Sequence, residues 1–404
     1  MDRISLTPRP NWQQIVEGQG LTFHTLDNGE PYWDESAAYE FTAAEIDTLE
    51  AAANELQGMC LAAAQHIIDT RRYADLTIPV AAIPVIEAAW NAEPPALYGR
   101  FDLVWAGAQS GNPPKLLEYN ADTPTSLLEA AVIQWNWLEE VGPRLPTHSF
   151  LPFTATKADQ FNSLHERLIA KWKDVAPSFQ QPVYFAGVDT PEDTLTLAYL
   201  EDTAQQAGLP TRPIPMLQIG WNDPRQAFVD QQENQIQTLF KLYPWETMLA
   251  EDFGPHALRN YGQLTWIEPI WKMLLSNKGI LPVLWELYPN HPLLLECYFD
   301  SPRNMPAYVR KPLLSREGED VSITYADGTT VENPGTYANS SQARFIFQDL
   351  APPAVFPDNL RPTRQRHPVL GLWMVDQECA GMGVRESAGP ITGNLSSFVP
   401  HLFR

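Results

Sequence analysis

Two short runs of residues, 98–102 and 115–125, constrain the fold of this chain most, and a predicted loop lies between them. Side chains alternate between the faces of a strand, so Arg100 and Asp102 share one face of the first run. Glu118 and Asn120 share one face of the second run in the same way. Residues 106–114 are rich in Gly, Pro and polar side chains and predict the loop. If the two strands pair antiparallel about this loop, Asp102 lies opposite Glu118 and Arg100 lies opposite Asn120.

This pairing places two carboxylates directly across a ladder, where like charges repel. The arrangement therefore needs a cation beside Asp102 and Glu118. Two carboxylates and the amide oxygen of Asn120 are the hard oxygen ligands that Mg²⁺ prefers, and Arg100 is suited to a phosphate. The pattern predicts a Mg-nucleotide site. A solvated polar face on two neighbouring strands is the alternative interpretation of these residues alone.

The length of 404 residues predicts two or three subdomains, or one large α+β enzyme. A net charge of −22 argues against a nucleic-acid surface and favours a cationic partner such as a polyamine, although an ordinary acidic cytoplasmic protein also explains it. No apolar run approaches about 18 residues, which predicts no membrane partner. The N-terminal residues lack the apolar core of a signal peptide, and the three cysteines form no CxxC pair. We therefore expect a cytoplasmic protein.

Helical spacing of apolar residues predicts several elements in the first part of the chain. A capping-box pattern opens a long helix over 42–71, and a shorter helix is expected over 83–92. The run after the Glu118–Asn120 strand predicts a second capped helix over 126–141. Strand, tight polar turn and helix are thus the expected setting of the carboxylate and amide pair.

A boundary is predicted over 143–152, followed by a small α/β unit. An apolar strand is expected at 183–187 and a helix over 195–208, with Thr190 and a proline at its start. A strand near 216–220 would complete a β-α-β unit without any GxGxxG motif. The predicted role of this unit is a scaffold with one loop facing a substrate.

The last part of the chain predicts a loop that joins two strands. Strands are expected at 308–313 and 321–323, with the polar, glycine-bearing loop 315–320 between them as a lid. Another strand is expected at 345–348, and 368–384 is strand-like with a glycine-rich turn at its end.

Several common catalytic motifs are absent from the sequence, namely GxxxxGK[ST], GxSxG, HExxH and the kinase HRD set. What remains are two lysines, Lys278 and Lys311, two arginines, Arg100 and Arg385, and the acidic pair with its amide. Phosphoryl transfer needs cations around a triphosphate, magnesium on its oxygens and a lid that excludes water. Surface lysines are the alternative for Lys278 and Lys311 taken singly.

Six motifs follow one another in a specific order over most of the chain. They are Arg100-Phe101-Asp102, Leu117-Glu118-Tyr119-Asn120-Ala121-Asp122, Glu268-Pro269-Ile270-Trp271, Asn277-Lys278 with Pro289-Asn290-His291, Val309-Arg310-Lys311-Pro312 and Gly383-Val384-Arg385. In this order they resemble the glutathionylspermidine synthase family, and specifically its stand-alone acid–amine ligase branch without the amidase domain. The resemblance implies an α+β chain with an ATP-grasp-like fold and a small α/β (preATP-grasp-like) subdomain.

The expected division has three parts. Residues 1–145 form an α+β region with the Arg-x-Asp and Glu-x-Asn motifs, 146–263 form the small α/β subdomain, and 264–404 form the ATP-grasp region with the lysines and the lid.

The resemblance also implies roles for single residues. The metal ligands for two Mg²⁺ ions would be Asp102, Glu118 and Asn120. Arg100 would stabilise the transferring phosphoryl group, with Arg385 as a second catalytic, phosphate-facing arginine. The implied ATP-binding set is Arg100, Asp102, Lys278, Lys311, Gly318 in the lid, Gln348 and Leu350 beside the adenine, Gly383 and Arg385.

The implied reaction is amide formation between a small acid, such as a peptide, and an amine, such as a polyamine, through an acyl phosphate made from ATP. Two differences from the pattern of the family leave the identity of the acid substrate open. The segment 123–126 reads Thr-Pro-Thr-Ser where the bifunctional synthases have a glutathione-contacting Ser- and Cys-containing run, and the lid is more charged than theirs. A non-catalytic nucleotide-binding protein on the same fold and an ATP-dependent phosphotransferase that needs no amine are the alternatives.

Overall fold

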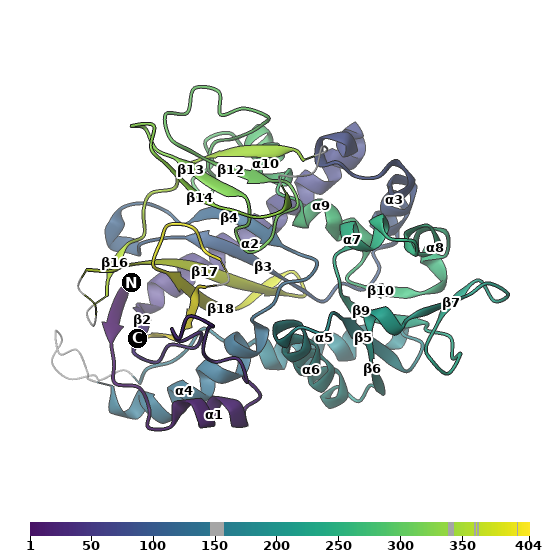
Figure 1. The fold of residues 1–404 in the computed structure, drawn as a ribbon, viewed down its shortest axis with the longest axis horizontal. Coiled ribbons are helices and arrows are strands. Elements are labelled where there is room, and N and C mark those ends of the chain that lie inside the picture. The colour runs from purple at the N-terminus through teal and green to yellow at the C-terminus, as the bar shows by residue number, and fades with distance from the viewer. Residues whose placement is uncertain (146–156, 338–342, 359–360, 362, 394) are drawn as a thin grey trace.

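A central antiparallel sheet carries the residues that the sequence singles out. The computed structural model describes residues 1–145, 157–337, 343–358, 361, 363–393 and 395–404. The sheet has the strand order β19-β18-β17-β3-β4, with β16 added to β17 (Figure 1). Its strands are β3 (Tyr98–Val104), β4 (Lys115–Asn120), β16 (Phe356–Pro357), β17 (Gln365–Val375), β18 (Glu378–Ser387) and β19 (Ser397–Val399).

The long helix α2 (Ala43–Thr70) packs behind this sheet (Figure 1). It begins at the predicted capping box, because the Thr42 side chain accepts from the backbone of Glu45 and the Glu45 side chain accepts from the backbone of Thr42. The apolar positions that predicted it are buried, including Leu49, Leu56 and Cys60. Cys297 and Cys379 are buried and free as well.

A second antiparallel sheet lies over one part of the central sheet, at the top of Figure 1. Its order is β11-β15-β12-β13-β14, so the predicted lid loop does join two paired strands, β12 and β13. The strands are β11 (Cys297–Phe299), β12 (Tyr308–Pro312), β13 (Val321–Thr324), β14 (Thr330–Asn333) and β15 (Phe345–Asp349).

The small α/β unit forms a four-stranded parallel sheet of order β10-β9-β5-β6, at the right of Figure 1. The predicted strand and capped helix are confirmed as β5 and α6, and Thr190 accepts from the backbone of Asp193. The elements are α5 (Leu164–Val175), β5 (Val183–Gly187), α6 (Pro191–Gln206), β6 (Thr211–Pro215), β9 (Thr238–Leu242), α7 (Trp245–Ala250), α8 (Gly254–Arg259) and β10 (Thr265–Ile267).

The remaining elements complete the chain. The strands β1, β2 and β20 form a three-stranded sheet that joins the two ends of the chain, and β7 pairs with β8. These elements are β1 (Asp2–Ser5), α1 (Trp12–Gly18), β2 (Ala37–Phe41), α3 (Ile83–Ala92), the π-helical turn η4 (Glu129–Ile133), α4 (Gln134–Val141), β7 (Gly220–Asn222), β8 (Ala227–Val229), α9 (Met273–Ser276), α10 (Ile280–Leu287) and β20 (His401–Phe403).

The sheets do not follow the three predicted residue ranges. Strand β3, from the first range, pairs with β17, from the third, and β10 completes the sheet of the second range from just beyond its predicted end. Residues 146–152 of the predicted boundary lie outside the described residues. The division into three ranges stays a prediction.

Three local predictions are wrong. Ser126 does not cap the helix that follows, because its backbone is left-handed (φ 67°) and its hydroxyl contacts Tyr32 instead. The strand expected near 216–220 lies earlier, as β6, whose two prolines disguise it in the sequence; β6 is an edge strand of its sheet, where proline is tolerated.

The third wrong prediction concerns the glycine-rich run near the C-terminus. Gly381 and Gly383 lie inside β18, and the turn between β17 and β18 is made by Asp376 and Gln377, both with positive φ. A Cβ on Gly383 would come within 2.8 Å of the Phe398 ring, so glycine is needed here for close packing and not for a turn.

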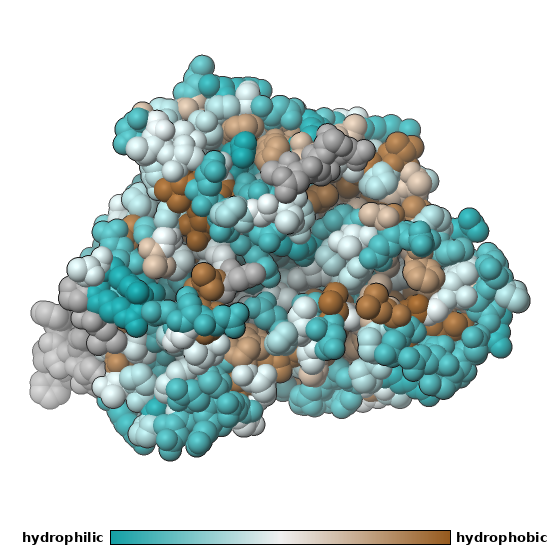
Figure 2. Space-filling view, in the orientation of Figure 1, coloured by the Kyte–Doolittle hydropathy of each residue, from teal (hydrophilic) through white to brown (hydrophobic). Residues whose placement is uncertain are grey.

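The face of the molecule drawn in Figure 2 is largely hydrophilic, with apolar atoms in small separate groups. Within the described residues, every helix is too short or too polar to cross a membrane.

Candidate active site

The predicted register of β3 and β4 is confirmed. Arg100 pairs with Asn120 and Asp102 pairs with Glu118 across the antiparallel ladder. The two carboxylates lie side by side, and the Asn120 amide donates to both of them, at 3.2 Å to Asp102 Oδ2 and 3.1 Å to Glu118 Oε1. Three oxygen-bearing side chains therefore converge on one place.

Cationic side chains of the chain itself neutralise the two carboxylates. Arg100 donates from Nε to Asp102 Oδ1 at 2.6 Å and from Nη2 to Oδ2 at 3.0 Å. Lys278 Nζ lies 3.0 Å from Glu118 Oε2. Arg100 reaches this position by crossing Gly371 of β17, where an added Cβ would lie 2.9 Å from Arg100 Cδ. Any larger residue at Gly371 would displace the guanidinium.

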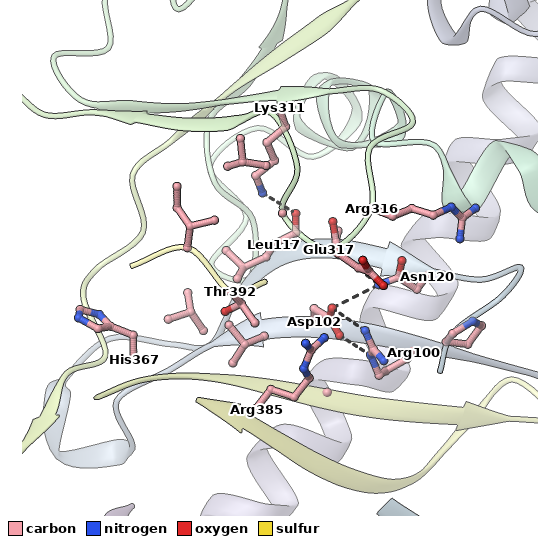
Figure 3. A pocket seen from close by; sticks show the side chains of 18 of the residues that line it. Arg100, Asp102, Leu117, Asn120, Lys311, Arg316, Glu317, His367, Arg385 and Thr392 are labelled. Carbon is pink, nitrogen blue, oxygen red and sulfur yellow. Dashed lines mark hydrogen bonds and ion pairs between the residues drawn. The ribbon is translucent and has the colours of Figure 1, made fainter. Parts of the chain in front are cut away.

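The carboxylates open into a cavity of about 480 Å³ between the central sheet, the upper sheet and the small α/β unit. Figure 3 shows Lys311 entering it from above and Arg100, Asp102 and Arg385 from below. Every residue that the sequence predicted for the site lines this one cavity. They are Arg100, Asp102, Glu118, Asn120, Lys278, Lys311, Gly318, Gln348, Leu350, Gly383 and Arg385.

Lys311 comes from β12 and is buried, with Glu118 as a charged neighbour. Its Nζ donates to the Leu117 carbonyl at 3.0 Å and to Gln348 Oε1 at 2.7 Å. Burial lowers the pKa of Lys311 to about 8, although the Glu118 carboxylate opposes this. Burial alone would raise the pKa of Glu118, but Lys278 and Lys311 outweigh it and lower that pKa to about 2. The site therefore pairs a carboxylate with a lowered pKa and a buried lysine whose pKa is also lowered.

The lid loop between β12 and β13 lies over the cavity. Gly318 has a φ of +70°, and a Cβ there would come within 2.4 Å of the Thr392 carbonyl oxygen. Arg316 donates to Thr123 Oγ1 at 2.6 Å and forms an ion pair with Glu246 of α7 at 2.7 Å. The lid thus rests on the turn after β4 and on the small α/β unit.

Arg385 projects from β18 toward Asp102 and Arg100 (Figure 3). Its Nη2 donates to the Gly393 carbonyl at 2.9 Å, and its buried Nε has no hydrogen-bond partner among the described residues. The guanidinium therefore keeps unused donor capacity beside the carboxylates.

Further residues line the cavity that sequence reasoning did not assign to the site, among them Glu192, Asp193, Arg316 and His367. Arg316 lies in the predicted lid, and Glu192 and Asp193 lie in the first turn of α6, at the predicted helix start. The sequence therefore predicted the elements that carry these residues, but not their place at the site. Burial and the neighbouring Glu192 raise the pKa of Asp193 to about 6. His367 carries no signal in the sequence.

No group of three or more His, Cys, Asp or Glu among the described residues could hold a metal ion. A metal bound by this chain's cavity would therefore depend on an amide as well as on carboxylates. The cluster of Asp102, Glu118 and Asn120 has that composition, and the acidic and amide oxygens suit Mg²⁺.

Comparison with known proteins gives a match over nearly the whole chain. A family model described as "Glutathionylspermidine synthase preATP-grasp" matches residues 3–404. The chain belongs to this family. The resemblance inferred from the ordered motifs is thus confirmed.

Relatives within the glutathionylspermidine synthase family differ in length. A protein of Haemophilus influenzae named "Putative acid–amine ligase" is 37% identical over 419 residues, which cover 100% of both chains. Trypanothione synthetase of Crithidia fasciculata is 26% identical, over 83% of this chain and 52% of its own length. Bifunctional glutathionylspermidine synthetase/amidase of Escherichia coli is 25% identical, over 77% of this chain and 51% of its own. The chain spans about half the length of the latter two.

Proposed function

We propose that this chain is an ATP- and Mg²⁺-dependent ligase that joins a carboxylate to an amine, on an ATP-grasp-like fold with a small preATP-grasp-like subdomain. One observation carries the proposal. A single cavity collects eleven predicted residues, and eight of them come from five of the six ordered motifs, which are spread over most of the chain. The family to which the chain belongs, and the ligase and synthetase names of its relatives, support the same reaction class.

The residues that line the cavity favour one direction for a bound ATP. The phosphates would lie among Arg100, Lys278 and Lys311, which supply the positive charge that a triphosphate needs. The adenine would lie toward Gln348 and Leu350, where the cavity wall is more apolar.

Asp102, Glu118 and Asn120 would hold the Mg²⁺ ions. Bound there, magnesium would screen the phosphate charges and orient the triphosphate. Arg100 is already hydrogen-bonded to Asp102, so the guanidinium would meet the transferring phosphoryl group beside the metal ligands.

The chemistry would take place in two steps. The carboxylate of the acid attacks the γ-phosphorus of ATP, ADP leaves, and an acyl phosphate forms. The amine then attacks the acyl carbon and displaces phosphate. Arg100 and Arg385 would stabilise charge as it develops, and the lid with Gly318 would exclude water from the acyl phosphate.

We expect the acid to be peptide-like and the amine to be a polyamine or diamine. Glu192 and Asp193 add negative charge to the cavity wall near the lid, which favours a cationic amine. The names of the relatives include glutathionylspermidine and trypanothione synthetases, and they support the same substrate classes.

The test is ADP release from Mg-ATP by the purified protein. The acid pool contains glutathione, other short peptides and simple carboxylic acids, and the amine pool contains spermidine, putrescine and 1,3-diaminopropane. We expect ADP only when both pools are present, and Arg100→Ala should abolish it. Tight ATP binding without ADP from any pair would contradict a ligase and favour a nucleotide-binding protein. ADP released with the acid pool alone, in step with a phosphorylated product, would indicate a phosphotransferase.

A further inference from the structure

A row of hydrogen bonds leads from the cavity wall to a buried carboxylate. Ser126 lines the cavity, and its Oγ lies 3.2 Å from the Tyr32 hydroxyl. The Tyr32 hydroxyl donates to Glu129 Oε1 at 2.6 Å. All three residues are buried, with Tyr32 and Glu129 each only 2% exposed. None of the three has a part in the nucleotide site described above.

The local backbone holds these groups in line at some conformational cost. Ser126 has left-handed backbone angles (φ 67°), which a non-glycine residue seldom adopts. Glu129 opens the π-helical turn η4, and such turns are frequent at functional sites. Phe23 packs against the Tyr32 ring with the centroids 4.9 Å apart. The arrangement is therefore fixed from three separate segments.

The surroundings of Glu129 allow it to exchange a proton. Burial raises the pKa of Glu129 to about 7, although the Tyr32 hydrogen bond opposes this. The other charged groups that act on it are Glu192 from α6, which raises the pKa further, and Arg385 from β18, which lowers it. Burial raises the pKa of Tyr32 well above its usual value, so the hydroxyl keeps its proton and can pass it on.

We propose that Ser126, Tyr32 and Glu129 form a proton relay that deprotonates the amine substrate. The inference rests on the proposed ligase reaction, in which an alkylammonium ion has no lone pair until it loses a proton. One proton passes from the nitrogen to Ser126 Oγ, the Ser126 proton passes to Tyr32, and the Tyr32 proton passes to Glu129.

The neutral amine then attacks the acyl phosphate, and the bonds and protons of this step balance. The neutral amine forms the C–N bond as the bond from the acyl carbon to the phosphate oxygen breaks. The second proton of the nitrogen leaves with the phosphate, and Glu129 is left as a carboxylic acid that later returns its proton to solvent. Ser126 is the only member of the relay that would touch the substrate, and Tyr32 and Glu129 act through it.

Two nucleophiles separate proton removal from the rest of the reaction. The acid pool and Mg-ATP are supplied either with the amine pool or with hydroxylamine, which is largely uncharged at neutral pH and traps an acyl phosphate as a hydroxamate. In Glu129→Gln and Tyr32→Phe we expect amide formation to fall by about 100-fold, in line with general base catalysis. Hydroxamate formation should stay close to that of the unmodified protein. The pH profile of amide formation should lose its acidic limb in Glu129→Gln.

Tyr199→Phe is the matched control, because Tyr199 is also buried and its hydroxyl contacts His165 Nδ1 at 3.1 Å, away from the cavity. It should change neither product. An equal fall of amide and hydroxamate in Glu129→Gln would overturn the relay and indicate a structural role. Unchanged amide formation in both variants would overturn it too. If the unmodified protein makes neither product, the ligase itself is wrong.

Discussion

Two carboxylate sites lie within five residues of each other and behave differently. Glu118 faces the cavity, and its partners Lys278 and Asn120 also line that cavity. Asp122 is 1% exposed, and it binds Lys241 at 2.6 Å and the backbone nitrogen of Trp245 at 3.0 Å. The first carboxylate is open to the cavity, and the second has its partners inside the fold.

The difference shows how the chain builds a site from one short motif. Three consecutive residues in the turn after β4 form hydrogen bonds to other segments of the chain. Ala121 donates to Ser276 Oγ, Asp122 binds Lys241 of β9, and Thr123 accepts from Arg316 of the lid. Strand β4 can therefore present Glu118 and Asn120 to the cavity while the next residues hold the central sheet, the small α/β unit and the lid together.

The largest expected effect follows from breaking the buried pair. Asp122→Ala leaves Lys241, which is fully buried, without its carboxylate, so we expect the free energy of unfolding in urea to fall by about 3–5 kcal/mol. The double variant Asp122→Leu, Lys241→Met should recover most of that loss, because an apolar pair needs no partner. A single variant as stable as the parent would remove the distinction between the two carboxylates.

The next effect, of a change at Glu118, should appear mainly in the ADP-forming rate and less in the free energy of unfolding. Glu118→Gln removes a proposed metal ligand with little change of shape, and we expect the ADP-forming rate to fall by two to three decades, about 3 kcal/mol. Its free energy of unfolding should fall by less than that of Asp122→Ala. A Glu118→Gln protein that keeps its rate but loses stability would place Glu118 with Asp122 as a structural residue.

The pH dependence of ATP affinity tests the residues that line the cavity. Lys311 carries its charge below its pKa of about 8 and loses it above, so ATP affinity should fall as the pH rises from 8 to 9, by about fivefold. Titration of ATP binding by calorimetry measures this. In Lys311→Met the affinity should be weak and should no longer change over that interval. An equal slope in both proteins would assign the pH dependence to another group.

The smallest effect concerns the lid. Gly318→Ala combines a positive φ with contact to the Thr392 carbonyl, so we expect the closed lid to be destabilised by about 1–2 kcal/mol and the turnover rate to fall about tenfold. Gly328→Ala is the control, because Gly328 also has a positive φ but nothing lies within 4 Å of an added Cβ. Gly328→Ala should cost stability and leave turnover unchanged. Equal turnover losses would exclude a specific role for the lid contact.

The sequence predicted the local parts of the site well because they depend on short-range patterns. Strand alternation gave the faces of β3 and β4, and the capping box gave the start of α2. The ordered motifs contain eight of the eleven predicted residues that line the cavity. In each case the signal lies within a few residues or in their order along the chain.

The rest depends on contacts between distant segments, which no local pattern records. Ser126 misleads as a cap because its partner, Tyr32, is 94 residues away. The prolines of β6 argue against a strand in the sequence, and they are tolerated because β6 is an edge strand of its sheet. Asp122 belongs to the same motif as Glu118, and only Lys241, 119 residues away, shows that it is structural.

The most direct test of the proposed ligase follows an oxygen atom. The acid that supports ADP release is labelled with ¹⁸O in its carboxylate, and the phosphate released after amide formation is analysed by mass spectrometry. An acyl phosphate formed in this cavity transfers one labelled oxygen to each phosphate, and the amide keeps the other. Phosphate without label, formed together with the amide, would contradict attack of the carboxylate on ATP and with it the proposed reaction.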